Sequence, residues 1–336
     1  MRAGRTITAA LPALLLMLSG LEARADMLRG TLAGYHNETF SVAVGIGVMK
    51  GQADELVYNG DGSKLSHLIW TFDNVRMLKV EASARLSSWL RLGVIGQYAL
   101  SGNSTMDDYD WLAPYVQYAF QPNWTDWSHH EDTELTDSTR LDIYAAAPLY
   151  EEANLQFSAL AGFRRDHFKW QARGGSYVYS NYGFRDATGT FPAGELGISY
   201  EQWWSTPYIG AEIRAQYDKV TVRGKFIGSW WVDSEDVDLH HMRDLMFEER
   251  FDQGSMMSAE LEASFRVTDR FSILGSYEYV NHDEVKGPTA VSDENTGAPI
   301  GYYDADAAGA ILETHTVHLG VRYDLHRAAL PPPTFR

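Results

Sequence analysis

Two things are missing from this chain of 336 residues: cysteine, and any long hydrophobic run beyond its N-terminal segment. Without cysteine the chain can form neither disulfides nor thiolate metal sites, and a lipid anchor attached through cysteine is excluded. No later apolar run approaches the roughly 20 residues that a transmembrane helix needs. A chain of this kind can therefore span a membrane only as a closed β-barrel, in which every backbone polar group is paired.

Basic side chains are also scarce, with 28 Lys and Arg against 45 Asp and Glu, which gives a net charge of -17. This surplus of negative charge argues against a nucleic-acid partner and favours cationic partners. Aromatic residues, by contrast, are abundant, with 19 Tyr and 10 Trp. Tyr and Trp gather at the two interfaces of membrane barrels, so their number fits a membrane-spanning chain.

The N-terminus has the pattern of a secretory signal peptide. Arg2 and Arg5 supply positive charge, residues 7–18 are mostly apolar, and Ala23-Arg24-Ala25 forms a small-residue cleavage site. About 12 apolar residues are too few to cross a bilayer. We therefore expect residues 1–25 to be removed. That segment carries three Arg and one Glu, so the mature chain has a net charge near -19.

Alternation of apolar and polar residues with a period of two dominates the rest of the chain. Within residues 255–267, for example, Leu261 and Phe265 lie on one face of an extended segment, and Glu260 and Glu262 lie on the other. A soluble β-sandwich buries one face of each strand, whereas here the inward face is charged on strand after strand. Such a face suits a water-filled barrel lumen better than a packed core. A soluble all-β fold remains a minor alternative.

Ten such segments can be counted, and their connections alternate between short turns and long loops, as in bacterial outer-membrane barrels. The segments span residues 40–57, 65–87, 90–101, 139–148, 154–172, 192–217, 220–233, 255–267, 270–281 and 313–325. The short turns fall at Ser87-Ser88, Glu151-Glu152, Asp218-Lys219 and Thr268-Asp269, and the long loops at 58–64, 102–138, 173–191, 234–254 and 282–312. We therefore predict an all-β fold, a ten-stranded antiparallel transmembrane β-barrel with long extracellular loops. An even number of strands closes the sheet without an edge.

The barrel domain is expected over residues 26–325, followed by a Pro-rich C-terminal extension over 326–336. Pro331-Pro332-Pro333 in this extension lack the backbone N–H that a β-ladder needs, so we expect it to leave the sheet. Pro207 lies inside the sixth segment. The same missing donor predicts a bulge or a bend there.

Two groups of ionisable residues stand at the rims of predicted strands. Asp108 and Asp110 share one face of an extended chain, and so do Asp236, Asp238 and His240. If the two faces meet across the barrel, an imidazole lies opposite a carboxylate pair with space for a water between them. His240 can then act as a general base oriented by Asp238. The opposing aspartates can fix the water and share a proton, because two close carboxylates do not both ionise easily.

This pattern alone leaves other interpretations open. Acidic loop residues are usually just solvated, and a chain with 45 Asp and Glu contains some Asp-x-Asp pairs by chance. A metal site with Asp and His ligands is a further interpretation, but no compact His-rich spacing supports it. We therefore predict no metal.

Several longer blocks, in order along nearly the whole mature chain, carry a specific resemblance. They are Leu68-Ile69-Trp70, residues 106–111, residues 124–128, residues 172–177, residues 183–186, residues 207–210, and Trp231-Val232 followed by Asp236-x-Asp238-x-His240. Through these blocks the chain resembles the omptin family of outer-membrane aspartyl proteases. The resemblance implies a groove at the extracellular mouth of the barrel, where a peptide bond next to a basic residue is hydrolysed.

The resemblance also implies roles for individual residues. The catalytic set consists of Asp108, Asp110, Asp238 and His240. Glu55 and Asp236 match the family's pocket for the residue before the cut, and Asp126 matches a position that lines the next pocket. Paired buried carboxylates select Arg or Lys, because a neutral side chain leaves their charge uncompensated.

Three histidines and a glycine-rich stretch lie near these positions. The family shares a histidine at the place of His130, so His129 and His130 have either a supporting role or a solvated place in an acidic loop. His241 has the opposite parity to His240 and is expected on the lipid side or the loop surface. Arg173-Gly174-Gly175 is expected to shape a loop, because glycine permits unusual backbone angles.

Omptins as a family require lipopolysaccharide, held by basic residues on the outer wall of the barrel, and this chain departs from that pattern. His167 and Trp203 replace arginines, and Phe251 stands where a lysine is expected. Arg165, His167 and Lys169 nevertheless share one strand face, a partly basic ladder that can meet lipid phosphates. We therefore expect lipopolysaccharide as a partner and activator with altered head-group preference, and no other cofactor.

A non-catalytic adhesin or receptor for cationic partners is the alternative function, because acidic external loops fit a protease and a receptor equally well. A pure binding barrel, however, has no reason to keep the four catalytic residue types together with Glu55 and Asp236. An open diffusion pore fits less well, since ten strands leave little lumen once charged side chains fill it. The sequence thus predicts an outer-membrane endopeptidase that acts on peptides or proteins with basic residues.

Overall fold

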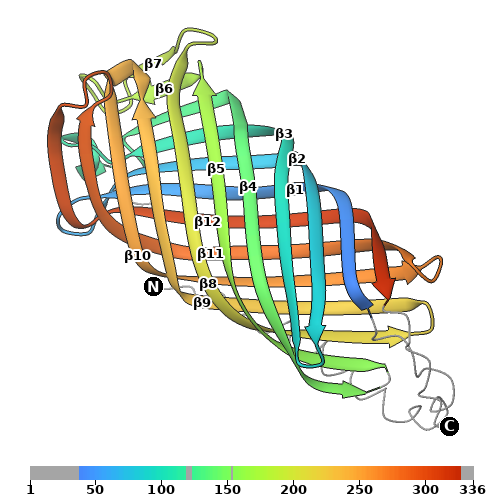
Figure 1. Ribbon diagram of the computed structural model, residues 1–336. Helices are drawn as coiled ribbons and strands as arrows, with labels where there is room; N and C mark the ends of the chain where they lie inside the picture. Colours follow the sequence, from blue (N-terminus) through green and yellow to red (C-terminus); the bar gives the residue numbers. More distant parts are fainter. Residues whose placement is uncertain (1–37, 119–122, 153, 327–336) are drawn as a thin grey trace, which may run out of the picture.

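The computed structural model describes residues 38–118, 123–152 and 154–326, and its architecture is a closed barrel of ten long strands (Figure 1). The expected signal peptide and residues 327–336 of the expected extension lie outside the described residues, whereas His326, predicted as the start of the extension, ends the last strand. The ten strands are β1 (Glu38–Tyr58), β2 (Lys64–Ser87), β3 (Leu90–Asp110), β4 (Asp126–Glu152), β5 (Leu155–Arg173), β8 (Leu196–Tyr217), β9 (Val220–His240), β10 (Leu245–Arg266), β11 (Phe271–Asp293) and β12 (Pro299–His326).

Each long strand pairs antiparallel with the next long strand along the chain, and β1 pairs with β12 to close the ring. The predicted ten-stranded antiparallel barrel is therefore confirmed. A short hairpin of β6 (Ser176–Tyr179) and β7 (Ala187–Thr190) extends from β4 at one end of the barrel. The 3₁₀ helices η2 (Tyr115–Tyr118) and η3 (His241–Arg243) span one turn each. Over the described ranges, no helix has the length and apolar character needed to cross a membrane.

A belt of exposed apolar side chains surrounds the barrel wall. Ile46 and Leu319 are 67% and 68% exposed, and Leu261 on β10 is 57% exposed. In a membrane barrel such side chains face lipid, so the belt marks the membrane-spanning part of the wall. On β9 the exposed apolar side chains end at Trp230-Trp231. Residues 232–240 of β9 therefore lie beyond the belt, at the end that carries the β6–β7 hairpin.

The strands extend further at this end than the sequence predicts. β3 continues to Asp110 and β4 begins at Asp126, so most of the region 102–138 is strand rather than loop. β9 and β10 likewise occupy most of the region 234–254. Beyond the membrane both faces of the wall meet polar surroundings, so the apolar alternation ends although the ladder continues. β11 continues to Asp293 and β12 begins at Pro299, so most of the region 282–312 is also strand. The boundaries of all three loops are corrected accordingly.

The predictions for the bulge and for the short turns agree better with the structure than those for the long loops. The β8–β9 ladder is irregular between Ser205 and Ile209, on either side of Pro207, so the predicted bulge is confirmed. The turn at Asp218-Lys219 separates β8 from β9 as predicted. The turn predicted at Glu151-Glu152 is wrong, because both residues still belong to β4, so the connection to β5 comes later in the chain than expected.

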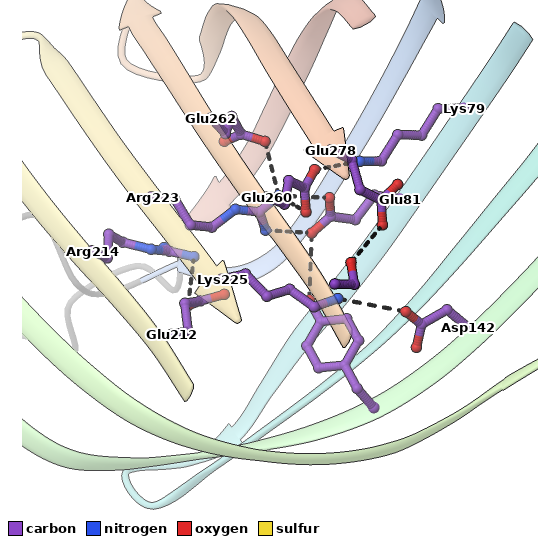
Figure 2. Close-up of polar contacts among 12 residues, drawn as sticks. Lys79, Glu81, Asp142, Glu212, Arg214, Arg223, Lys225, Glu260, Glu262 and Glu278 are labelled. Atoms are coloured by element: carbon purple, nitrogen blue, oxygen red, sulfur yellow. Dashed lines mark hydrogen bonds and ion pairs between the residues drawn. The ribbon is translucent and has the colours of Figure 1, made fainter. Parts of the chain in front are cut away.

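The lumen is filled by paired charges (Figure 2). Arg223 binds Glu81 at 2.7 Å and Glu262 at 2.8 Å, and Lys79 binds Glu260 at 2.5 Å. All five side chains are buried. Partners from different strands compensate these inward charges and make their burial tolerable, so ion pairs occupy much of this part of the lumen. This filling agrees with the expectation that ten strands leave little open lumen.

A layer of aromatic side chains follows toward the end that carries β6 and β7. Trp70, Phe72, Phe168, Trp170 and Tyr200 are all nearly inaccessible to solvent. The rings of Trp70 and Tyr200 stack with centroids 5.6 Å apart, and those of Trp170 and Tyr200 lie 6.0 Å apart. The layer spans the barrel from β2 to β8 and forms an apolar floor. Carboxyl groups placed on this floor are poorly hydrated, which changes their acidity.

Candidate active site

A cavity of about 490 Å³ opens beyond the apolar belt, and its lining includes Asp108, Asp110, Asp238 and His240. The two aspartates Asp108 and Asp110 lie at the end of β3, and the other two residues lie at the end of β9. β4, β5 and β8 separate these strands along the ring, so the side chains reach the cavity from different parts of the wall. The structure thus brings together the four residues that the sequence places in the catalytic set.

The histidine and its neighbouring acid form a buried dyad. Nε2 of His240 lies 2.5 Å from Oδ2 of Asp238, and Asp238 is only 1% exposed. A carboxylate that accepts a hydrogen bond from Nε2–H leaves Nδ1 of the same ring as the proton acceptor. Nδ1 is in contact with the guanidinium of Arg243 from η3. The proton-accepting atom of the dyad is therefore Nδ1, and Arg243 sits against it.

The aspartate pair shares one face of β3 and is held by a serine hydroxyl. Ser66 on β2 donates a hydrogen bond of 3.2 Å from Oγ to Oδ1 of Asp108. Burial raises the pKa of Asp108 well above its usual range, and the charge of Asp110 raises it further. Burial also raises the pKa of Asp110, to about 6, against the opposing charge of Arg243. The upward shift is larger for Asp108, so a proton shared by these two adjacent carboxyl groups lies mainly on Asp108.

The three predicted substrate-binding acids occupy different places. Glu55 on β1 and Asp126 on β4 line the same cavity as the catalytic set. Oδ1 of Asp126 accepts a 2.9 Å hydrogen bond from the backbone N–H of Ser180. Asp236 is 2% exposed and lies beneath the cavity, where its Oδ2 accepts a 2.8 Å hydrogen bond from the hydroxyl of Tyr200. Burial raises the pKa of Glu55 well above its usual range and that of Asp236 to about 7.

Comparison with known proteins decides the family. The model of the Omptin family matches residues 36–325. The chain belongs to the Omptin family. It is 34% identical to the plasminogen activator of Yersinia pestis over 288 residues, which is 85% of this chain and 89% of the relative. It is 29% identical to protease 7 of Escherichia coli strain K12, over 85% of this chain and 90% of that protein.

A solved structure supports the same assignment. The crystal structure of the outer membrane protease OmpT from Escherichia coli superposes with a TM-score of 0.81 at 28% identity, covering 87% of this chain and 98% of that one. Family, relatives and fold together place this omptin in the outer membrane and make it a peptide-bond hydrolase.

Two charged residues of this omptin belong to the site although they are absent from the sequence prediction. Arg243 lines the cavity, and Glu249 on β10 is the register partner of Asp236 on β9. A signal for Glu249 existed in principle. A short turn after His240 sets the antiparallel register and places Glu249 opposite Asp236. The interpretation of residues 234–254 as a loop concealed that pairing.

The neighbouring histidines separate into distinct environments. His130 is 3% exposed, lines the cavity and hydrogen-bonds to Ser128 at 3.1 Å, so a solvated place for it is wrong. His129 faces away and lies 2.9 Å from Asp107. His241 lies outside the cavity lining and pairs with Glu294 at 2.5 Å.

The glycines of the stretch after β5 are required by geometry. Gly174 and Gly175 have φ angles of 53° and 111°, which side chains with a Cβ rarely adopt. A Cβ at Gly175 would also lie 2.8 Å from Nδ1 of His130. The loop-shaping role predicted for these glycines is confirmed, and it fixes the wall behind His130.

The outer-wall ladder on β5 is already paired with acids. Arg165 binds Glu235 at 2.8 Å, while His167 and Lys169 bind Glu201 at 2.7 Å and 2.8 Å. These three side chains share one outward face as predicted, but their charge is partly compensated. The placement of Phe251 on the outer wall is wrong, because this side chain is 1% exposed and belongs to the buried core.

Proposed function

We propose that this omptin is an endopeptidase that hydrolyses peptide bonds next to Arg or Lys, with a water activated between the Asp238–His240 dyad and the Asp108–Asp110 pair. The observation that carries the proposal is the single cavity lined by all four side chains and by Glu55. The site faces the exterior of the cell, because long strands and loops of outer-membrane barrels extend on that side.

The dyad acts as the base. Nδ1 of His240 removes a proton from the water, and the resulting hydroxide adds to the peptide carbonyl carbon. Asp238, held at 2.5 Å from Nε2, orients the ring and stabilises the imidazolium that forms. The imidazolium then returns its proton to the leaving amine, so the enzyme ends in its starting protonation state. Arg243 must move away from Nδ1 when the water and substrate occupy the cavity.

The aspartate pair holds the water from the opposite side. With one proton between them, Asp110 accepts a hydrogen bond from the water while Asp108 supplies an acidic hydrogen for the carbonyl oxygen. The Ser66 hydroxyl keeps Asp108 in place. A nucleophile positioned between two fixed groups needs little further ordering to react, and this lowers the barrier.

Substrate choice follows from the buried acids. Glu55, on the cavity wall, binds the basic side chain of the substrate residue that precedes the cleaved bond. Asp236 lies beneath Glu55 and adds negative charge to the same pocket. Asp126 favours a basic residue after the cut. A guanidinium or ammonium group compensates these acids, whereas a neutral side chain leaves them buried without a counter-charge.

The direct test uses the mature protein, refolded with lipopolysaccharide, and a quenched peptide that contains Arg-Arg. Cleavage by the wild type, together with loss of cleavage in His240→Ala and Asp108→Ala, is the expected result. Equal cleavage by the wild type and both variants would assign the activity to a contaminant. Tight binding of the peptide without cleavage would favour the alternative, a non-catalytic receptor for cationic partners.

We further propose that lipopolysaccharide activates this omptin through the ladder of Arg165, His167 and Lys169, with an altered head-group preference. Each of these three side chains already has a carboxylate partner, so lipid phosphates compete with Glu201 and Glu235 for them. Activity that rises on addition of lipopolysaccharide to the detergent-purified protein supports the proposal. Equal activity with and without the lipid refutes it.

A further inference from the structure

Four carboxyl groups form one buried cluster at the base of the catalytic cavity. Glu55 comes from β1, Asp236 and Asp238 come from β9, and Glu249 comes from β10, and none of them is more than 2% exposed. Asp236 and Glu249 are direct register partners, so their side chains project side by side into the lumen. Asp236 lies two residues below Asp238, a step of roughly 7 Å along the strand. The cluster therefore has a second tier beneath the cavity wall.

The carboxyl groups are joined in two pairs. Glu249 hydrogen-bonds to Asp236, and Glu55 hydrogen-bonds to Asp238. A carboxylate has no hydrogen to donate, so each pair must hold at least one proton. Burial and the charge of Asp236 raise the pKa of Glu249 well above its usual range. The second tier is therefore a carboxyl group sharing its proton with a carboxylate.

One oxygen of each carboxyl group has no hydrogen-bond partner among the described residues: Glu55 Oε2, Asp236 Oδ1, Asp238 Oδ1 and Glu249 Oε2. The other groups that face Glu249 are Tyr200 on β8 and Thr289 on β11, and neither is basic. Within the described ranges, no Lys or Arg forms an ion pair with any of these four acids, and the only ion-pair partner of the cluster is His240 on Asp238. Buried polar oxygens without partners are rare in proteins, and here they point to a cationic ligand.

We propose that Glu249 is an additional acid of the pocket for the basic side chain, and that it releases its proton to solvent when a guanidinium or ammonium group enters. The inference rests on the proposed function, because the entering cation is the substrate side chain that Glu55 meets first. Charge is conserved in the pocket, since one cation enters as one proton leaves. Glu249 does not line the cavity and acts through Asp236, so it is a positioning residue.

A pH-dependent affinity follows from this exchange. At low pH the second tier stays protonated in both the empty and the occupied pocket, and Glu249 adds no charge. Near neutral pH the occupied pocket gains the charge of Glu249, so affinity for basic peptides rises with pH. Glu249→Gln keeps a hydrogen-bond donor for Asp236 but cannot ionise, so this variant remains in the low-pH state throughout.

The test measures binding apart from catalysis. His240→Ala protein, in the presence of lipopolysaccharide, is titrated calorimetrically with an Arg-Arg peptide in two buffers of different ionisation enthalpy, which counts the protons released. The same protein carrying Glu249→Gln is compared with the matched control Glu248→Gln, whose side chain lies on the exposed face of the same strand. Circular dichroism and thermal unfolding verify that the variants form the same barrel.

The expected result depends on pH. At about pH 7 the parent and the Glu248→Gln control release protons on binding, while Glu249→Gln releases fewer and binds roughly tenfold more weakly, as loss of a nearby buried charge predicts. At about pH 5 all three proteins bind alike, because Glu249 is protonated and uncharged in the parent and the control, and the amide of the Glu249→Gln variant is uncharged at every pH. In proteins that retain His240, the kcat/KM at about pH 7 should follow the same order: the wild type and Glu248→Gln are alike, and Glu249→Gln is lower.

Two outcomes overturn the inference while the proposed function stands. The first is cleavage of the peptide by the wild type with equal affinity and proton release in Glu249→Gln and Glu248→Gln at about pH 7. The second is binding by the parent without any proton release, which does not depend on the variant folding. Failure of the wild type to cleave any basic peptide rejects the proposed function, and the inference falls with it.

Discussion

At the scale of single residues, the proposed mechanism depends on one nitrogen atom. In that mechanism Nδ1 of His240 accepts the proton of the water, because Asp238 occupies Nε2. We predict that His240→Ala lowers kcat by roughly 10²–10⁴-fold, the usual contribution of a general base. Asp238→Asn should also lower kcat, because an amide can hold the ring in the wrong tautomer. Stopped-flow or fluorescence assays with the quenched peptide measure both effects, and an unchanged kcat in His240→Ala contradicts the assignment.

Arg243 provides a second prediction at this scale, for the pH dependence of the reaction. Its positive charge lowers the pKa values of Asp108 and Asp110 against the effect of burial. Removing that charge in Arg243→Gln raises both pKa values. Asp110 must be ionised to hold the water, so the acid limb of kcat/KM, expected at about pH 6 in the wild type, shifts to higher pH. A limb that stays in place shows that Arg243 does not act on the pair.

The sequence was informative for residues that lie on regular strands. Period-two parity placed Asp108 with Asp110, and Asp236 with Asp238 and His240, on common faces. The meeting of these faces across the ring cannot be derived from parity, and it came from the family resemblance. The sequence did not predict Arg243 and Glu249 as part of the site, because their positions depend on the tight turn after His240 and on the register between β9 and β10.

At the scale of structural elements, the ends of the strands were the least predictable part. β3, β9 and β10 continue well past their predicted limits. Apolar and polar residues alternate along a strand because one side of the wall faces lipid, and the alternation ends where the wall leaves the membrane. The site stands on these membrane-free extensions, so the pattern that reveals the barrel fades where the chemistry begins.

The paired ends of β9 and β10 give a prediction for stability. Burial raises the pKa of Asp236 to about 7, whereas an unfolded aspartate has a pKa of about 3.9. The folded state therefore binds more protons than the unfolded state between these values, and stability falls as pH rises from about 4 to about 7. Asp236→Asn should flatten this dependence.

Unfolding in denaturant and detergent, measured by circular dichroism at several pH values, tests the prediction. Asp233→Asn is the control, because Asp233 lies on the exposed face of the same strand. A parallel decline with pH in Asp236→Asn and Asp233→Asn would show that Asp236 does not contribute.

At the scale of the whole molecule, the barrel supports the site, and its inward side chains close the lumen beneath that site. The sequence predicted charged inward faces correctly, but the pairing of those charges into a filled lumen requires the three-dimensional register. The buried ion pairs of Lys79, Glu81, Arg223, Glu260 and Glu262, here called the ionic cluster, and the aromatic layer above them keep solvent from the base of the site. The acids of the pocket owe their raised pKa values to this dry floor.

The ionic cluster yields a prediction about the whole fold. Arg223 is the shared partner of Glu81 and Glu262. Arg223→Met leaves both carboxylates buried without their main counter-charge, which should reduce stability by roughly 3–5 kcal/mol. Thermal unfolding in detergent measures this loss. Cleavage of the Arg-Arg peptide at low temperature should persist, because the cluster does not reach the cavity; a stable Arg223→Met barrel would contradict the role of the cluster.

In the proposed mechanism, a basic side chain of the substrate enters a buried acidic pocket beside a bound water. The most direct measurement compares kcat/KM for two peptides that differ only in arginine or citrulline before the cut, with mass spectrometry to locate the cleaved bond. Citrulline has nearly the same shape without the charge. We expect cleavage after arginine to be at least about 100-fold faster. Equal rates for the two peptides would contradict it.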